Sequence, residues 1–177
     1  MSKVNVLPII HGHLGTLYDQ RTHRRDPSDF LLLFVIPLLI GIGVVALRFG
    51  FRVDAVNGFL NAFAILMGLL LNLLVLVFTL ASTTTVTRSK PALRRLLMRE
   101  VFFNIGFCIL LALAVVIQSV VALSYMRSNA FAVTGPVATF VLSAVGSCFV
   151  GTLLMVIKRM YVLMDSELSN ADIRQED

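Results

Sequence analysis

Three asparagines interrupt one of the most apolar stretches of the chain. Residues 57–82 read NGFLNAFAILMGLLLNLLVLVFTLAS, and hydrocarbon solvates amide side chains poorly. On a helix, one set of polar and small residues recurs at intervals of 4, 7, 4 and 7 within about 60° of arc: Asn57, Asn61, Gly68, Asn72 and Thr79. We call this set the asparagine stripe. It predicts hydrogen bonds between packed helices or the wall of a water-filled path, and both interpretations stay open.

His11 and His13 form an H-x-H pair, which could contribute two imidazole ligands to a metal ion. No cysteine or cluster of carboxylates accompanies the pair, so we expect two solvated imidazoles and keep metal binding as the alternative. The chain also lacks a nucleophile paired with a base, a glycine-rich phosphate loop and a metalloprotease motif. We therefore expect no catalytic residues, no cofactor and no enzymatic activity.

The composition around these residues is that of a membrane protein. Of the 177 residues, 58% are hydrophobic and 14% are charged, against about 25% charged residues in soluble proteins. A charge-free apolar run of about 18 residues or more can cross a bilayer as a helix. The chain has four such runs, at 30–47, 56–80, 101–123 and 133–157. We expect an all-α membrane protein with four transmembrane helices within 30–157.

Most basic residues lie on one side of these runs. Twelve of the 15 Lys and Arg residues precede the first run, separate the second from the third, or follow the fourth. The positive-inside rule then predicts cytoplasmic N- and C-termini. The parts outside the membrane become a cytoplasmic amphipathic N-terminal segment, 1–29, a basic cytoplasmic loop, 82–100, and a cytoplasmic tail, 158–177. Within this tail we assign no structure to the acidic stretch DSELSNADIRQED, 165–177.

The fourth run carries a small residue at every fourth position. These residues are Gly135, Thr139, Ser143, Ser147 and Gly151, and we call them the small-residue ridge. Small residues in membrane helices allow a neighbouring backbone to come close. The ridge predicts tight packing against another helix of the same chain or against a second copy, in a homo-oligomer.

The basic loop contains the stretch SKPALRRLLMRE, which predicts a basic amphipathic helix that begins at Pro91 and leads into the third run. We expect its cations to contact anionic lipids of the inner leaflet, with a soluble cytoplasmic protein as the alternative partner. Nucleic acid is not expected, because no aromatic residue alternates with these cations. The cations are Arg88, Lys90, Arg94, Arg95 and Arg99.

The arrangement HLGTLYDQRTHRRDPSDFLLLFVIPLLIGIG followed by NAFAILMGLLLNLLVLVF resembles small four-span proteins of bacterial phage-defence loci. Examples are the membrane subunit of Kiwa-type systems and the membrane accessory protein of type VI-B CRISPR loci, and the likeness covers residues 14–80 at most. The resemblance implies a homo-oligomer in the bacterial inner membrane that senses infection, anchors a soluble partner or forms a pore. The R-x4–6-H nuclease pattern suspected in some relatives is missing, because only Arg21 precedes a histidine, His23, and by two residues.

Three functions of different classes follow from these observations. The first is an oligomeric pore or membrane-perturbing effector of an antiviral defence system, in which the asparagine stripe lines an aqueous path. The second is a membrane sensor or scaffold, in which the stripe is buried packing and the basic loop recruits a soluble effector. The third is a transporter accessory subunit. Proton-coupled transport is disfavoured, because the four runs contain no Asp, Glu, Lys, Arg or His.

The distribution of basic residues makes the topology testable. We expect a topology reporter fused after Asp177 to be active only in its cytoplasmic form, and one inserted near Ser128 only in its periplasmic form. Reporter activity in bacterial cells measures both. The opposite pattern would contradict the orientation.

Overall fold

The computed structural model describes residues 6–16, 18–19, 24–25, 31–83, 91–126 and 133–172, with side chains over 6–15, 31–79, 98–126 and 133–161. The helices are α1 (Leu7–Thr16), the π-helical turn η1 (Leu31–Val35), α3 (Ile36–Ala46), α4 (Val53–Thr83), α5 (Pro91–Met126) and α6 (Pro136–Asp172). A two-residue antiparallel ladder pairs β1 (Tyr18–Asp19) with β2 (Arg24–Arg25). The expected all-α class is confirmed over the described part of the chain apart from this short ladder.

Three helices are long and apolar enough to cross a membrane by length and composition, over Val53–Thr79, Met98–Met126 and Pro136–Tyr161. They correspond to the second, third and fourth predicted runs. The first run forms a shorter apolar helix, Leu31–Ala46. Three of the four expected spans therefore meet the length that a bilayer requires, and the described part of the first falls below about 18 residues.

Helix α3 has a defined C-terminal end, one residue before the end of the predicted run. Arg48 adopts a left-handed backbone with φ of 54°. Its N–H donates to the Val45 carbonyl oxygen at 2.9 Å, and the Phe49 N–H donates to the Val44 carbonyl oxygen at 3.1 Å. This pair of bonds is a Schellman closure, which satisfies the last carbonyls of a helix and stops it. The chain then turns directly into α4.

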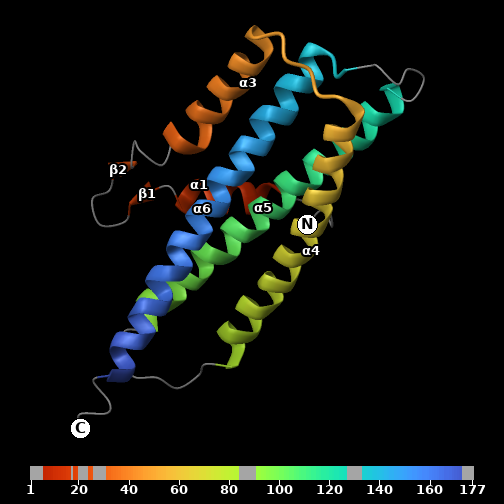
Figure 1. Cartoon of the computed structure of the whole chain (residues 1–177). Coiled ribbons are helices and arrows are strands. Elements are labelled where there is room, and N and C mark those ends of the chain that lie inside the picture. Colours follow the sequence, from red (N-terminus) through yellow and green to blue (C-terminus); the bar gives the residue numbers. More distant parts are fainter. Residues whose placement is uncertain are drawn as a thin grey trace.

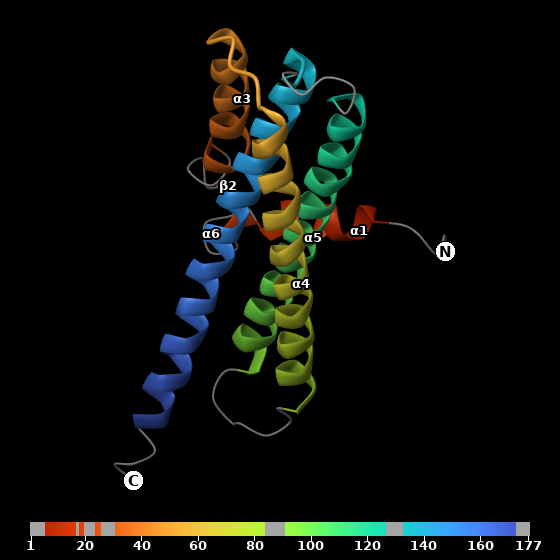
Figure 2. The same ribbon diagram turned by 45° about the vertical axis from the view of Figure 1, so that its right-hand side comes forward.

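The long helices run side by side along one axis (Figures 1 and 2). Helix α5 packs against α4 and α6, while α3 packs against the upper part of α6 in the view of Figure 1. Helix α1 lies crosswise against α5, below α3 (Figure 2). We use "upper end" for the end that carries the connections between α3 and α4 and between α5 and α6.

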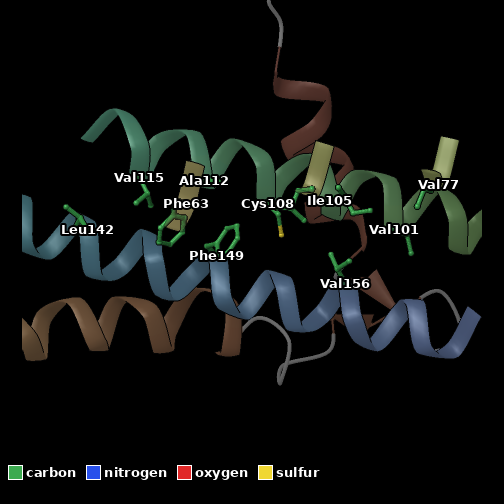
Figure 3. Close-up of a cluster of buried hydrophobic side chains, with 11 residues drawn as sticks. Phe63, Val77, Val101, Ile105, Cys108, Ala112, Val115, Leu142, Phe149 and Val156 are labelled. Carbon is green, nitrogen blue, oxygen red and sulfur yellow. The ribbon is translucent and has the colours of Figure 1, made fainter. Parts of the chain in front are cut away.

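The core is a heptad seam on α5. Its buried residues alternate at intervals of four and three: Val101, Ile105, Cys108, Ala112, Val115, Ser119, Ala122 and Met126. The facing residues of α4 and α6 recur every seven positions: Val56, Phe63, Leu70 and Val77 on α4, and Leu142, Phe149 and Val156 on α6. Figure 3 shows this core, in which the Phe63 and Phe149 rings meet at 4.9 Å. Such spacing produces the knobs-into-holes packing of left-handed helix bundles.

A polar clamp closes the upper end. The Thr134 N–H donates to the Phe51 carbonyl oxygen at 2.9 Å, and the Phe51 N–H donates to Thr134 Oγ1 at 2.9 Å. Thr134 Oγ1 is also 2.6 Å from Thr139 Oγ1. These bonds hold the chain between α3 and α4 against the start of α6.

One helix boundary outside the apolar runs agrees with the sequence prediction, and another differs from it. Helix α5 begins at Pro91, so the amphipathic lead-in within the predicted loop 82–100 is continuous with the third run, as its proline suggested. Helix α6 continues to Asp172, so the expectation of no structure in 165–177 is wrong for residues 165–172. Extending a formed helix needs no new nucleus, and residues 158–172 contain no glycine or proline to stop it.

The contact between α3 and α6 provides a matched pair of substitutions. A Cβ atom on Gly41 would lie 3.0 Å from the Phe140 ring and 3.2 Å from the Ala144 Cβ, whereas one on Gly43 would meet nothing within 4 Å. We expect Gly41→Leu to lower stability by about 1–3 kcal/mol by forcing α3 from α6. Gly43→Leu should be neutral or stabilising, because leucine favours helix by up to about 1 kcal/mol over glycine.

Thermal aggregation of the detergent-solubilised protein measures both variants. Equal midpoints for Gly41→Leu and Gly43→Leu would show that the close approach of α3 to α6 contributes nothing to stability.

Candidate functional site

The asparagine stripe lies on the outer face of α4. All five of its residues are exposed, and a Cβ atom on Gly68 would meet nothing within 4 Å. Two stripe residues are each nine positions, or about two and a half turns, from a buried core residue: Asn61 from Leu70, and Asn72 from Phe63. The stripe therefore faces directly away from the core of its own chain.

Because Asn61 and Asn72 face away from the core, they do not form hydrogen bonds to the other described helices of their own chain. Asn61 lies eight residues from one end of the apolar segment Val53–Thr79, and Asn72 lies seven residues from the other. Both amides are thus about 10 Å or more from the ends of the segment along the helix axis. In a bilayer they need a second chain or water, since an unsatisfied amide in hydrocarbon costs several kcal/mol.

The small-residue ridge does not form one contact surface. Thr139 belongs to the upper clamp, and Ser143 Oγ donates to the Thr139 carbonyl oxygen at 2.7 Å. Gly151 is buried beside η1, where its Cβ would lie 3.5 Å from the Leu32 carbonyl oxygen. Gly135 is exposed and Ser147 is half-buried. A step of four residues drifts by about 40°, so the ridge rotates from the clamp towards α3 along α6.

Of the predicted lipid-contact cations, only Arg99 has a described side chain. It is exposed, and its guanidinium lies 5.7 Å from the centroid of the Phe103 ring. Arg94 and Arg95 lie on α5 with side chains outside the described set, and Arg88 and Lys90 lie outside the described residues.

A buried polar cluster lies where α1 crosses α5. His13 is fully buried, with its Nδ1 atom 2.7 Å from the Asn104 Oδ1 atom and its ring stacked on Phe107 at 4.0 Å and 11°. Asn104 is also fully buried, and its Nδ2 donates to the Met155 Sδ atom at 3.7 Å. We call His13, Asn104, Phe107 and Met155 the histidine node. It joins α1, α5 and α6.

The expectation of a solvated His13 is therefore wrong, while His11 is exposed. Residues two apart on a helix do not face each other, so α1 directs the two imidazoles to different sides and they cannot share one ion. Among the described residues, no three His, Cys, Asp or Glu side chains gather as a metal site. The four-residue interval between Ile9 and His13 is the local signal that could have placed His13 on the packed face.

The surroundings of the node favour a neutral imidazole. The oxygen of an amide can only accept a hydrogen bond, so His13 Nδ1 carries the proton and donates it to Asn104. Burial lowers the pKa of His13 below its ordinary value of 6.5, the bond to Asn104 partly opposes this shift, and the positive charge of Arg159 adds to it. Arg159 forms an ion pair with Glu100 between α6 and α5.

Glycines allow α1 to approach α5 closely. A Cβ atom on Gly12 would lie 2.4 Å from the Phe103 ring, which is shorter than any real contact. On the other side, a Cβ atom on Gly106 would lie 3.2 Å from Ile9. Helix α1 is therefore docked by specific shape as well as by the hydrogen bond of His13.

The glycines of α1 provide a second matched pair. Gly12→Ala should displace Phe103 and weaken α1 docking by about 1–3 kcal/mol, because the added methyl group has no space. Gly15→Ala meets nothing within 4 Å and should stabilise the helix by about 0.5–1 kcal/mol. Hydrogen exchange of the α1 backbone amides measures both effects. Equal protection of α1 in the two variants would contradict this docking geometry.

No protein-family model, characterised protein or solved structure matches the chain. The likeness to membrane proteins of phage-defence loci, and the antiviral role that it implies, stay predictions. The described geometry instead offers two features for function, the exposed asparagine stripe and the histidine node.

Proposed function

We propose that the chain forms a homo-oligomer in a membrane and that the outer faces of its α4 helices surround a water-filled path. The observation that carries this proposal is the asparagine stripe, which is exposed on the side of α4 opposite the core. Lipid would leave the amides without partners. An assembly of copies brings the stripes towards one axis and keeps lipid away from them.

The length of the stripe favours a path over local packing bonds. Asn57 and Thr79 are 22 residues apart, or about 33 Å along a helix, which is close to the hydrocarbon thickness of about 30 Å. One or two amides suffice to join helices, whereas a path must be polar across the whole membrane. Large exposed residues of α4 beside the stripe supply apolar surface for lipid or for the neighbouring copy. Examples are Ile65, Leu69 and Leu76.

The proposed topology has four crossings with cytoplasmic N- and C-termini. The chain reverses direction after α3, at the upper end. At the other end of this segment, Leu33 of η1 packs against Met155 of α6, which is part of the histidine node. The helix formed by the first run, Leu31–Ala46, is about 24 Å long, which is most of a hydrocarbon thickness of about 30 Å. The basic lower end, with Arg99 and Lys158 exposed, would face the anionic inner leaflet.

The alternative function is a scaffold for a soluble partner, and the length of α6 favours it. The apolar part of α6 ends at Tyr161, but the helix continues to Asp172, about 16 Å further. A projecting helix on the basic side would offer a docking surface for a cytoplasmic protein. The asparagine stripe would then be a dry interface between copies.

Cysteine substitution along α4 distinguishes a path from a dry interface. With the protein in liposomes, Asn61→Cys and Asn72→Cys should react with a membrane-impermeant thiol reagent and lose ion flux on modification, because both positions would face water. Leu69→Cys lies about 100° from Gly68 around the helix and should stay unreactive. The unsubstituted protein controls for reaction at Cys108 and Cys148.

Replacing Asn72 by leucine tests whether an apolar side chain in the stripe blocks the path. Asn72→Leu should keep the thermal stability of the oligomer and abolish flux, because an apolar constriction excludes water. Absence of flux from the unsubstituted protein, together with a loss of about 1 kcal/mol or more in Asn72→Leu, would overturn the path and favour the scaffold.

A further inference from the structure

A groove between the upper parts of α5 and α6 is open along one side. Its volume is about 720 Å³, which lies within the range of about 300–1,000 Å³ of pockets that take a small organic molecule. Its walls come from residues within 118–126 of α5 and 133–141 at the start of α6. The groove therefore extends over eight residues of α5, or about 12 Å along the helix axis. This length is most of one leaflet, since half of the hydrocarbon thickness is about 15 Å.

The groove lies on the side of α5 that α1 covers lower down. Val121 follows Phe103 by 18 residues, which is five full helical turns, so the two side chains point the same way. The same interval separates Tyr125 from Phe107. Phe103 and Phe107 contact α1, which crosses α5 below the groove (Figure 2). At the level of the groove this face is not covered by other described residues, since Tyr125 is 83% and Val137 is 75% exposed.

The lining of the groove is mostly apolar because its polar groups are used inside the chain. Gln118 Nε2 donates to the Ala138 carbonyl oxygen at 2.9 Å. Thr134 Oγ1 accepts the Phe51 N–H at 2.9 Å. The other described lining residues are valine, alanine, methionine, proline and glycine, together with Tyr125. Such a groove favours a hydrocarbon chain over a polar ligand, which would lose its hydrogen bonds to water there.

A second, smaller hollow adjoins the groove and carries a cation. Its volume is about 250 Å³, and it shares Val133, Thr134 and Pro136 with the groove. Arg48 belongs to its wall. Arg52 is also adjacent to the groove, because it pairs with Val133 in an isolated antiparallel bridge. Both arginines are exposed, and neither forms an ion pair with another described residue.

We infer that this end of the protein binds an anionic phospholipid, with one acyl chain in the groove and the phosphate at Arg48 and Arg52. The described charges of the chain between α3 and α4 and of the first turn of α4 are these two arginines and Asp54, which sum to +1. A guanidinium can bind a phosphate through two parallel hydrogen bonds. The cations lie at the upper end and the groove extends below them, which is the order of headgroup and acyl chain in a leaflet. This inference does not depend on whether α4 lines a path.

A second copy of the chain is the other occupant that such a groove could take. A helix with its side chains is about 10–12 Å wide, and a groove of about 12 Å gives it contact over only about two turns. Two copies joined symmetrically through this face would also bring their unpaired arginines towards each other, and like charges repel. A phospholipid has neither disadvantage.

Photo-crosslinking from the acyl chain locates the lipid. The full chain is reconstituted in phosphatidylcholine vesicles that contain a trace of phosphatidylglycerol or of phosphatidylcholine, each with the same diazirine-labelled acyl chain. Peptide mapping after irradiation measures the labelling of residues 118–126 and 133–141. We expect phosphatidylglycerol to label these segments several-fold more than phosphatidylcholine does. The exposed segment 38–42 of α3 should be labelled about equally by both lipids.

Tryptophan substitutions test whether the chain lies in the groove. Gly135→Trp on one wall and Val121→Trp on the other add bulk to it, and a Cβ atom on Gly135 would meet nothing within 4 Å. Both variants should lose most of the labelling by phosphatidylglycerol. Gly58→Trp is the matched control on α4, because its Cβ atom would also meet nothing within 4 Å and it does not line the groove. Size-exclusion chromatography in detergent checks that each variant is folded.

Glutamine substitutions test the headgroup contact. Arg48→Gln and Arg52→Gln should each lower the preference for phosphatidylglycerol over phosphatidylcholine by about fivefold, which is the effect of one basic residue near an anionic lipid surface. Arg99→Gln removes an equal charge from the exposed surface at the lower end and should leave the preference unchanged.

The inference is overturned if the two lipids label the groove of the parent chain equally, because the groove would then contain only bulk lipid. Unchanged labelling in both Gly135→Trp and Val121→Trp would also overturn it. A loss of preference in Arg99→Gln as large as in Arg48→Gln and Arg52→Gln would show a general attraction of anionic lipid in place of a site.

A last arm tests the second copy as occupant. Val137→Cys is introduced into a chain with Cys108 and Cys148 replaced by alanine, and oxidation in vesicles is followed by non-reducing electrophoresis. We expect monomers, because lipid would cover this exposed position. Efficient formation of disulfide-linked dimers would overturn the lipid site. Ion flux is measured in no arm, so failure of this inference is distinguishable from failure of the path.

Discussion

Burial of a single seam on α5 determines how the other helices are placed. The seam alternates intervals of four and three residues from Val101 to Met126, and α4 and α6 pack against it with residues that recur every seven positions. This geometry assigns Phe63 and Leu70 of α4 to the core. The residues two and a half turns away, including Asn61 and Asn72, must then lie on the outside. The exposed amides are thus a direct consequence of the core packing.

The polar side chains of this apolar chain fall into two groups, those that connect helices inside the chain and those exposed on the outer face of α4. Inside the chain, several polar contacts join separate elements, among them the Phe51 and Thr134 clamp at the upper end and the histidine node where α1 meets α5 and α6. Gln118 adds another such contact, donating to the Ala138 carbonyl oxygen at 2.9 Å between α5 and α6. Among the described residues, the three asparagines of the stripe make no hydrogen bond to another element. The amides of the stripe face outward along most of α4, which is why we assign them to the assembly of several copies.

The histidine node and the asparagine stripe lie on different sides of α5. Asn104 and Phe107 contact α1, whereas Ile105 and Cys108 belong to the core shared with α4. Helix α5 therefore lies between α1 and α4 and packs against both.

Composition and apolar run length determined the all-α class, the positions of the three long helices and the start of α5 at Pro91, because these depend on local hydropathy and on the backbone of proline. The spacing of the stripe on one side of α4 was also readable, since helical periodicity is local. The sequence did not reveal which side of α4 faces outward, because that depends on the heptad packing of α4 against a seam about 40 residues away. Burial of His13 likewise required Asn104, 91 residues distant, and the close approach that Gly12 permits. The small-residue ridge looked like one surface in the sequence, but the tertiary structure divided it, because its four-residue interval rotates around α6 while α3 and the upper clamp occupy fixed sides of that helix.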